Sequence, residues 1–193
     1  MNKQPTDKEL VSRAKKGDKG AFDLLVRKHQ HKVVKLVSRY VRDPSEALDV
    51  TQEVFLKAYR GLDKFRGESA FYTWIYRIAV NTAKNHLQMQ SRRTPDHAVE
   101  AEEAEQYEGE SALKEYGTPE HQLLSEEINQ TVRDVIDNLP DDLRTAITLR
   151  ELEGMSYEEI AQVMDCPIGT VRSRIFRARE AIDKKLRPLL ERH

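Results

Sequence analysis

Several kinds of residue are scarce in this chain of 193 residues, and each scarcity excludes a class of protein. Cys166 is the single cysteine, so an internal disulfide bond is impossible. Eight glycines and seven prolines are few for a β-rich fold. No stretch approaches the roughly 18 apolar residues of a membrane-spanning helix, and the N-terminus lacks the apolar core of a signal peptide. We therefore expect a soluble, cytoplasmic protein.

Apolar residues recur along much of the sequence with the spacing of helix faces. Apolar residues make up 38% of the chain, enough for small helical cores, and the length predicts one or two small domains. Residues 91–118 differ, because they are acidic, contain Gly, Pro and Ser, and show little apolar periodicity. We predict an all-α fold with two small helical domains, residues 1–90 and 119–193, joined by a flexible acidic linker at 91–118.

Charge is unevenly distributed along the chain, although the formal net charge is −1. Residues 1–90 carry 18 Lys and Arg against 10 Asp and Glu, residues 91–167 carry 6 against 20, and residues 168–193 carry 8 against 3. Two basic blocks separated by an acidic one indicate two contacts with nucleic acid. Solvated helix faces would also explain much of any single block.

The first domain is expected to open with two helices. Thr6 and Glu9 have the spacing of a capping box, which predicts a helix that ends near Lys16. A second helix is predicted over residues 19–41. Its predicted core residues are Phe22, Leu25, Val33, Leu36, Val37 and Tyr40. His29 and His31 are two positions apart, so they point to different sides of a helix and do not form a metal pair.

A third predicted helix, residues 45–60, carries an unusual outer face. Its predicted buried residues are Ala47, Val50, Val54, Ala58 and Leu62. Its predicted outer residues are Asp49, Gln52, Glu53, Leu56 and Arg60. An exposed leucine among acids and an amide suits a surface for a partner, and an ordinary wet face with one stray leucine is the alternative.

The next predicted helix, residues 69–90, combines rings with cations. Ser69 is its predicted N-cap, and its predicted apolar stripe is Phe71, Trp74, Ile75, Ile78, Ala79 and Thr82. Beside that stripe lie Thr73, Arg77, Asn81 and Lys84, and the preceding turn adds Lys64, Phe65, Arg66 and Gly67. Cations hold phosphates and flat rings stack on unpaired bases, so the region suits single-stranded nucleic acid. Simple packing of the rings is the alternative.

The second domain ends in a helix-turn-helix. Helices are predicted over residues 120–138 and from Pro140 to a stop at Gly154. Their predicted apolar sets are Leu123, Leu124, Ile128, Val132, Val135 and Ile136, and then Leu143, Ala146, Ile147, Leu149 and Leu152. Ser156 and Glu159 form a second capping box, and the helix-turn-helix runs from Tyr157 to Phe176.

The last helix of that motif is predicted to continue to about Leu186. Its predicted buried stripe is Val171, Ile175, Ala178 and Ile182. Around it stand Arg172, Arg174, Arg177 and Arg179, which suit phosphates and the acceptor edge of guanine. A solvated basic helix is the alternative.

Two sets of motifs resemble bacterial sigma factors, the promoter-recognition subunits of RNA polymerase. Asp49-x-x-Gln52-Glu53-x-Phe, then Phe65-Arg66-Gly67, then Ala-Phe71-x-Thr-Trp74-x-Tyr-Arg-Ile-Ala-x-Asn81 resemble domain 2. Asn-Leu-Pro140-x-Asp-Leu-Arg-x-Ala-x-x-Leu-Arg and Cys166-Pro-x-Gly-Thr-Val-Arg-Ser-Arg174 resemble domain 4. The resemblance is closest to the extracytoplasmic-function sigma factors of the sigma-E type.

This resemblance implies a role for each region. Core polymerase binding falls to the helix from Asp49 to Leu62, with Asp49, Gln52, Glu53 and Leu56 as contacts. Capture of the −10 element falls to Phe65, Arg66, Ser69, Phe71, Thr73, Trp74, Arg77, Asn81 and Lys84. Recognition of the −35 element falls to Thr170, Arg172, Ser173, Arg174, Phe176, Arg177 and Arg179. It also implies a regulon for envelope or extracytoplasmic stress, and a membrane-bound anti-sigma factor that could hold the protein at the inner membrane face.

Other classes of function have less support. No Walker loop, GxGxxG motif, Cys/His metal spacing or recognisable nucleophile and base occurs in the sequence. We therefore expect no catalytic residue, no metal and no cofactor, which disfavours an enzyme that acts on nucleic acid. A plain transcription regulator that uses only the helix-turn-helix is the other alternative. The Trp74-bearing first domain argues against it.

Overall fold

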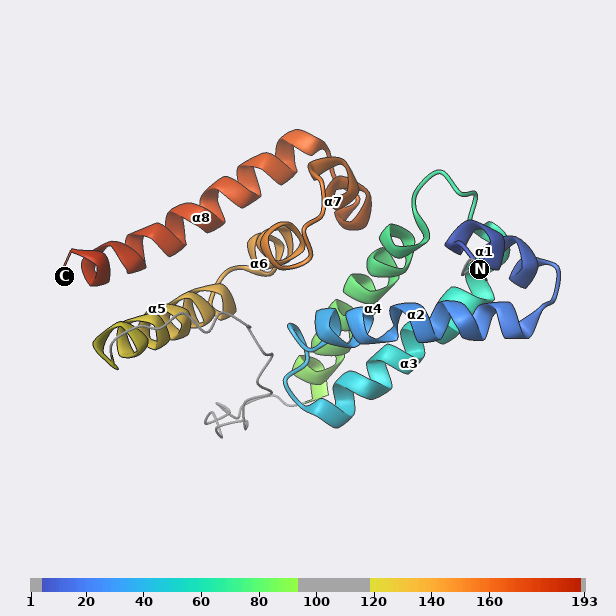
Figure 1. The fold of residues 1–193 in the computed structure, drawn as a ribbon, viewed down its shortest axis with the longest axis horizontal. Coiled ribbons are helices and arrows are strands. Elements are labelled where there is room, and N and C mark those ends of the chain that lie inside the picture. The colour runs from blue at the N-terminus through green and yellow to red at the C-terminus, as the bar shows by residue number, and fades with distance from the viewer. Residues whose placement is uncertain (1–4, 94–118, 192–193) are drawn as a thin grey trace. The chain divides into compact units, whose positions relative to one another are not determined.

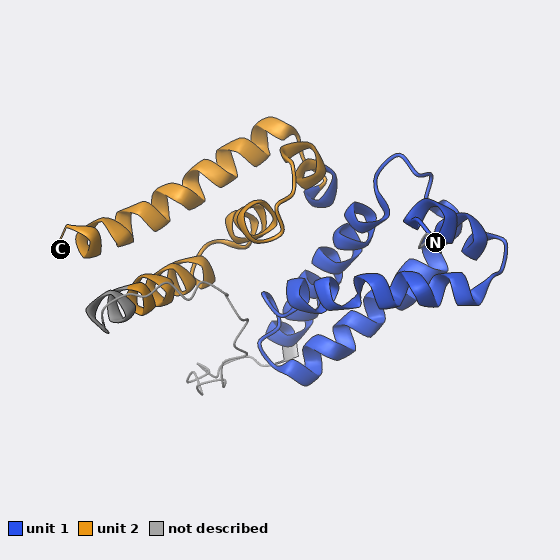
Figure 2. Ribbon diagram, in the orientation of Figure 1, with its two compact units in different colours: residues 1–105, 162–164 blue, residues 106–161, 165–193 orange. Residues whose placement is uncertain are grey.

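The structure is a computed structural model that describes residues 5–93 and 119–191 (Figure 1). All regular secondary structure in these ranges is helical, which confirms the predicted all-α class. The chain divides into two compact units (Figure 2). Helices α1 to α4 belong to the first and α5 to α8 to the second, except that residues 162–164 at the end of α7 group with the first unit.

The helices of the first unit begin where the sequence supplies caps. They are α1 (Asp7–Lys15), α2 (Lys19–Val37), α3 (Pro44–Gly61), the 3-10 turn η1 (Leu62–Lys64) and α4 (Phe71–Arg93). Thr6 and Glu9 form the predicted capping box of α1. Asp18 caps α2 after Gly17, whose φ of 92° stops the first helix. Asp43 caps α3 immediately before Pro44.

The core of the first unit is made of the faces that the apolar spacing predicts. Helix α2 packs against α1, α3 and α4, and α3 also packs against α4. Every predicted core residue of α2 is buried, as are Ala47, Val50, Val54, Ala58 and Leu62. His29 is buried and His31 is exposed, so the prediction that they face different sides is confirmed.

The boundaries of α2 and α4 differ from the prediction. Helix α2 ends at Val37 rather than near Val41. The N–H groups of Tyr40 and Val41 both donate to the carbonyl of Val37, and this tighter turn keeps both side chains in the core. Helix α4 begins at Phe71, and the carbonyl of Ala70 accepts from the Trp74 N–H, so Ser69 is not the N-cap.

The second unit contains the predicted helix-turn-helix. Its elements are α5 (Pro119–Asp137), α6 (Asp141–Ile147), the π-helical turn η2 (Thr148–Leu152), α7 (Tyr157–Met164) and α8 (Ile168–Leu190). Ser156 and Glu159 form the capping box of α7. Asp165 ends α7 with a left-handed φ of 53°, a conformation that Asp tolerates better than most residues.

Packing of the second unit centres on α8, against which α5 and α6 both lie. Val171, Ile175 and Ala178 are buried as predicted. Leu152 is 42% exposed, so its predicted burial was wrong. The helix that leads to it widens into the π-helical turn η2, which changes the direction of the side chains that follow.

Some predictions concern residues outside the described ranges. Residues 94–118 of the predicted linker are among them, and residues 91–93 belong to α4. The side chains of Leu123 and Leu124 also lie outside the described part of the structure. Among the described residues, no helix combines the length and apolar character needed to cross a bilayer.

Candidate protein and nucleic-acid interfaces

The outer face of α3 exposes leucine side chains among polar ones. Asp49, Gln52, Glu53 and Leu56 are all exposed, and Leu56 has 56% of its surface accessible. Leu48 is 52% exposed, and the sequence-based prediction did not include it in this outer face. It lies two helical turns before Leu56, so the i, i+8 spacing of the two leucines was the available signal.

A cluster of three aromatic rings lies where the loop after α3 enters α4. The centroid of the Trp74 ring lies 5.0 Å from that of Phe65 and 5.8 Å from that of Phe71. Phe65 and Phe71 are buried, whereas Trp74 is half-buried. A base cannot stack on a buried ring, so Trp74 alone of the three presents an accessible edge. The two phenylalanines support it from within.

The loop between η1 and α4 carries an exposed cation. Arg66 and Glu68 have 82% and 79% of their side chains accessible, and their charged groups are 4.0 Å apart. Gly67 has a φ of 75°, which an L-residue adopts only with strain. Ser69 is half-buried, and its hydroxyl donates to the Ala70 carbonyl. Arg66 is therefore accessible to a phosphate, although Glu68 lies beside it.

The predicted polar residues of α4 differ in accessibility. Arg77 and Asn81 are exposed, Lys84 is half-buried, and Thr73 is buried. The exposed pair is separated by one helical turn. A strand that follows α4 can therefore reach Arg77 and Asn81, but it cannot reach Thr73 without rearrangement.

Helix α8 separates its apolar stripe from an exposed, cationic face. Arg172, Ser173 and Arg177 are exposed, and Phe176 is 68% exposed. Thr170 is half-buried, and its carbonyl accepts a hydrogen bond of 2.9 Å from the Ser173 hydroxyl. An exposed phenylalanine among cations is costly in water and suits contact with a thymine methyl group.

The other two arginines of α8 with a predicted role, Arg174 and Arg179, have acidic partners that the sequence did not indicate. Arg174 Nη2 lies 2.6 Å from Asp142 in α6, and its Nη1 lies 3.4 Å from the sulfur of Cys166. Arg179 donates to Glu151 Oε1 from Nε at 3.1 Å and from Nη2 at 2.5 Å. The hydrogen bond to Glu151 raises the pKa of the Arg179 guanidinium. These partners are about 30 residues away in the chain, so no local pattern points to them.

No set of three His, Cys, Asp or Glu side chains within the described residues is placed to hold a metal ion. His29, the most buried of the candidate ligands, is occupied by a hydrogen bond to Asp7 at 2.9 Å.

Comparison with known proteins adds an independent observation. The family model described as sigma-70 region 2 matches residues 25–93, and the one described as sigma-70, region 4 matches residues 129–182. The chain is 64% identical over 193 residues, its full length and that of the relative, to the ECF RNA polymerase sigma-E factor of Escherichia coli strain K12. This chain belongs to the extracytoplasmic-function sigma factors. It binds core RNA polymerase and directs it to promoters.

Other relatives of this sigma factor agree. It is 63% identical over 190 residues, 98% of each chain, to the RNA polymerase sigma-H factor of Pseudomonas aeruginosa. Its fold is also that of CnrH in complex with the cytosolic domain of CnrY, with a TM-score of 0.67 and 22% identity over 94% of this chain and 97% of that one. The sigma factor RpoE of Bartonella quintana, in complex with the anti-sigma factor NepR, gives a TM-score of 0.62 and 23% identity over 86% and 96%.

The matched ranges cover the candidate sites of this sigma factor. The region 2 match contains the outer face of α3, the Arg66 loop and the whole of α4, which ends with the match at Arg93. The region 4 match contains the helix-turn-helix and the four arginines Arg172, Arg174, Arg177 and Arg179 of α8. Helix α1 and the first turns of α2 lie outside both ranges.

Proposed function

We propose that the outer face of α3 is the surface that binds core polymerase. Asp49, Gln52, Glu53 and Leu56 are its contacts, as the sequence predicts, and Leu48 joins them. The support is the exposure of two large apolar side chains two turns apart on one helix face, which water alone does not favour. Polar neighbours would then set orientation while the leucines supply most of the affinity.

The second part of the proposal is that the Arg66 loop and α4 capture the unpaired −10 element. Trp74 is the stacking platform, Arg66 and Arg77 hold phosphates, and Ser69, Asn81 and Lys84 supply further polar contacts. Phe65 and Phe71 act by holding the indole, because their own rings are buried. Thr73 contributes from within α4 rather than by touching DNA.

The third part is that α8 reads the −35 element as duplex DNA. Arg172, Ser173 and Arg177 contact base edges, and Phe176 packs against a base in the major groove. Thr170 and the paired residues Arg174 and Arg179 mainly set the position of the helix. In this arrangement residues 1–90 act on the −10 element and core, and residues 119–193 act on the −35 element.

Regulation and location follow from the same proposal. One solved structure of similar fold, the sigma factor RpoE of Bartonella quintana, is bound to the anti-sigma factor NepR. We place this sigma factor in the cytoplasm, held at the inner membrane face by a membrane-bound anti-sigma factor and released to transcribe an envelope or extracytoplasmic stress regulon. Polymerase supplies the catalysis, and the sigma factor itself is not an enzyme.

The observation that carries the proposal is the separation on α8 of a buried apolar stripe from an exposed face of cations and a phenylalanine. Transcription from promoter DNA by purified core polymerase, with and without this protein, tests it. We expect promoter-specific transcripts only when the protein is present. Loss of specific transcripts on replacing Arg172 and Arg177 by alanine, with core binding unchanged, would locate the −35 contact. Unchanged promoter selection by that variant would refute the assignment.

A further inference from the structure

The proposed function assigns no role to helix α1. The first turn of α1 contacts α2 through polar side chains. Asp7 accepts a hydrogen bond of 2.6 Å from Lys28 Nζ and lies 2.9 Å from His29 Nε2. The capping box of Thr6 and Glu9 fixes the same turn. The buried side chains of α1 are Leu10, Val11 and Ala14. These contacts make α1 a rigid part of the first unit rather than a loose arm.

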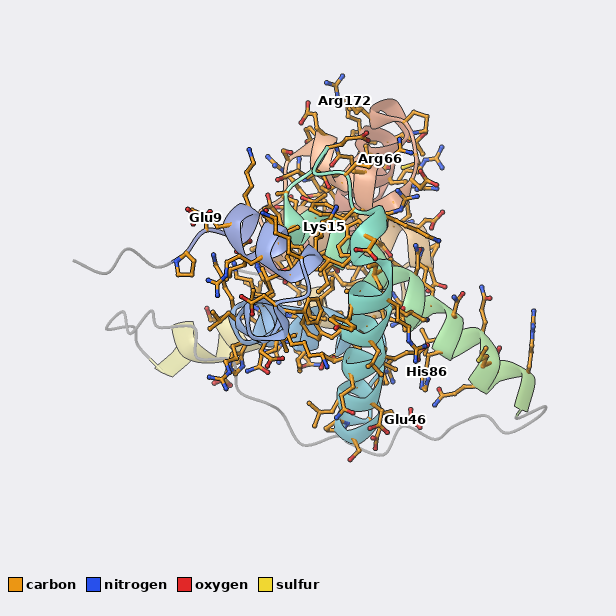
Figure 3. All side chains as sticks on the ribbon, turned by 90° about the vertical axis from the view of Figure 1, so that its right-hand side faces the viewer. Glu9, Lys15, Glu46, Arg66, His86 and Arg172 are labelled. Atoms are coloured by element: carbon orange, nitrogen blue, oxygen red, sulfur yellow. The ribbon has the colours of Figure 1, made fainter. Side chains whose placement is uncertain are left out.

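The last turn of α1 reaches a segment about 50 residues further along the chain. Lys15 Nζ lies 2.5 Å from the carbonyl oxygen of Phe65 and 3.5 Å from that of Asp63. Both carbonyls belong to the end of η1, where helical turns leave oxygens without an internal partner. A cation at such an end satisfies these oxygens and complements their partial negative charge. Figure 3 labels Lys15 on α1 and Arg66 in the loop that follows Phe65.

We infer that α1 positions the loop that captures the −10 element, and that Lys15 is the positioning residue. The inference rests on the proposed role of the Arg66 loop. Phe65 carries two anchors at once, because its carbonyl accepts from Lys15 while its ring packs on Trp74. The exposed Arg66 comes next in the chain, and Gly67, a residue with wide conformational freedom, follows it with a positive φ.

Lys16 provides a matched control for Lys15. It is an exposed lysine one position further on, and its side chain makes no hydrogen bond or ion pair within the described residues. Removing either lysine deletes one positive charge from the same end of α1. Only the removal of Lys15 also deletes the contact with the Phe65 carbonyl. A difference between the two variants therefore reports the contact rather than the charge.

The test uses holoenzyme assembled from core polymerase and the full chain. The probe is a fluorescent single strand that carries the −10 element selected from a randomised library by the wild-type holoenzyme, compared with a scrambled strand. The variants are Lys15→Met, Lys15→Arg and Lys16→Met, with Trp74→Ala as the reference for a lost base contact. Both strands are measured on one preparation, so any unfolded fraction cancels from the ratio of their affinities.

We expect Lys15→Met to lower the preference for the −10 strand about fivefold, which corresponds to about 1 kcal/mol. Lys16→Met should lower the affinity for both strands alike and leave the preference for the −10 strand unchanged. Lys15→Arg should retain most of the preference, because a guanidinium can still donate to the carbonyl. Melting temperature and core affinity of Lys15→Met should stay close to wild type.

Two results would overturn the inference without touching the proposed function. One is a Lys15→Met variant that keeps the wild-type preference while Trp74→Ala loses it. The other is a Lys15→Arg variant that loses as much preference as Lys15→Met. If the wild-type holoenzyme shows no preference for the −10 strand, or Trp74→Ala retains it fully, the proposed role of the loop fails and the inference fails with it.

Discussion

Arg177 should bind promoter DNA directly and Arg179 should not, although the two lie only two residues apart on α8. Arg177 is exposed and has no acidic partner in the described ranges, whereas Arg179 donates twice to one carboxylate oxygen of Glu151. A phosphate can approach Arg177 at once but must displace a carboxylate from Arg179. The perturbation is therefore the pair of single variants Arg177→Ala and Arg179→Ala.

The expected magnitudes differ between the two variants. A base-reading arginine costs about 1–3 kcal/mol when removed and relaxes one position of the site. A phosphate contact instead reduces the slope of log K against log salt by about 0.9. Arg177→Ala should show one of these effects. The ion pair of Arg179 is about half exposed on both sides, so its loss should cost the unit only about 0.2–1 kcal/mol of stability, with little change in the salt slope.

The assay is titration of a −35 duplex and of base-substituted duplexes with the full-length protein at several salt concentrations. Glu151→Gln is the informative companion, because it should free Arg179 for a phosphate and make the salt slope steeper. Equal loss of affinity and slope in Arg177→Ala and Arg179→Ala, with Glu151→Gln indistinguishable from wild type, would refute the reasoning.

Three further predictions concern the first unit. Glu53→Lys combined with Leu56→Ala should weaken binding to core polymerase with helicity unchanged by circular dichroism, and wild-type affinity would contradict the α3 surface. Trp74→Ala should slow open-complex formation on duplex promoters, with partial recovery on premelted ones. Unfolding of this variant would instead assign the ring to the core. Burial lowers the pKa of His29 although Asp7 opposes this, so the unfolded chain binds more protons below about pH 6.5 and the free energy of unfolding should fall on acidification. Denaturant titrations at pH 7 and pH 5.5 should show a smaller fall in His29→Gln, and an equal fall would contradict this assignment.

Local features of the sequence were enough to predict most of the helices and their buried faces. Both capping boxes form as predicted, because a side chain and a backbone N–H three residues apart need no help from the rest of the fold. The apolar spacing of α3 likewise identified buried residues, and that of α8 identified Val171, Ile175 and Ala178, although the predicted Ile182 is only half-buried. The motifs also indicated the sigma factor family, which the comparisons confirm.

Only the tertiary structure decided which ring of the aromatic cluster at the start of α4 is accessible to solvent. Phe65, Phe71 and Trp74 all look alike as candidate stacking residues in the sequence, yet only Trp74 keeps an accessible edge. Which ring is covered depends on how the loop after η1 folds back onto α4, and that path is set by contacts far apart in the chain. Leu152 shows the same limit, since a single wide helical turn changes the side that it faces.

Partners of charged side chains were also decided only by the tertiary structure. The sequence places four arginines around the apolar stripe of α8. It does not show that Asp142 approaches Arg174 or that Glu151 approaches Arg179. Lys15 in turn meets a carbonyl about 50 residues away. The sequence by itself determined the helices, their inner faces and the family, because these depend on spacing along one element. The pairing of charges depends on which elements come together, and only the folded chain decides that.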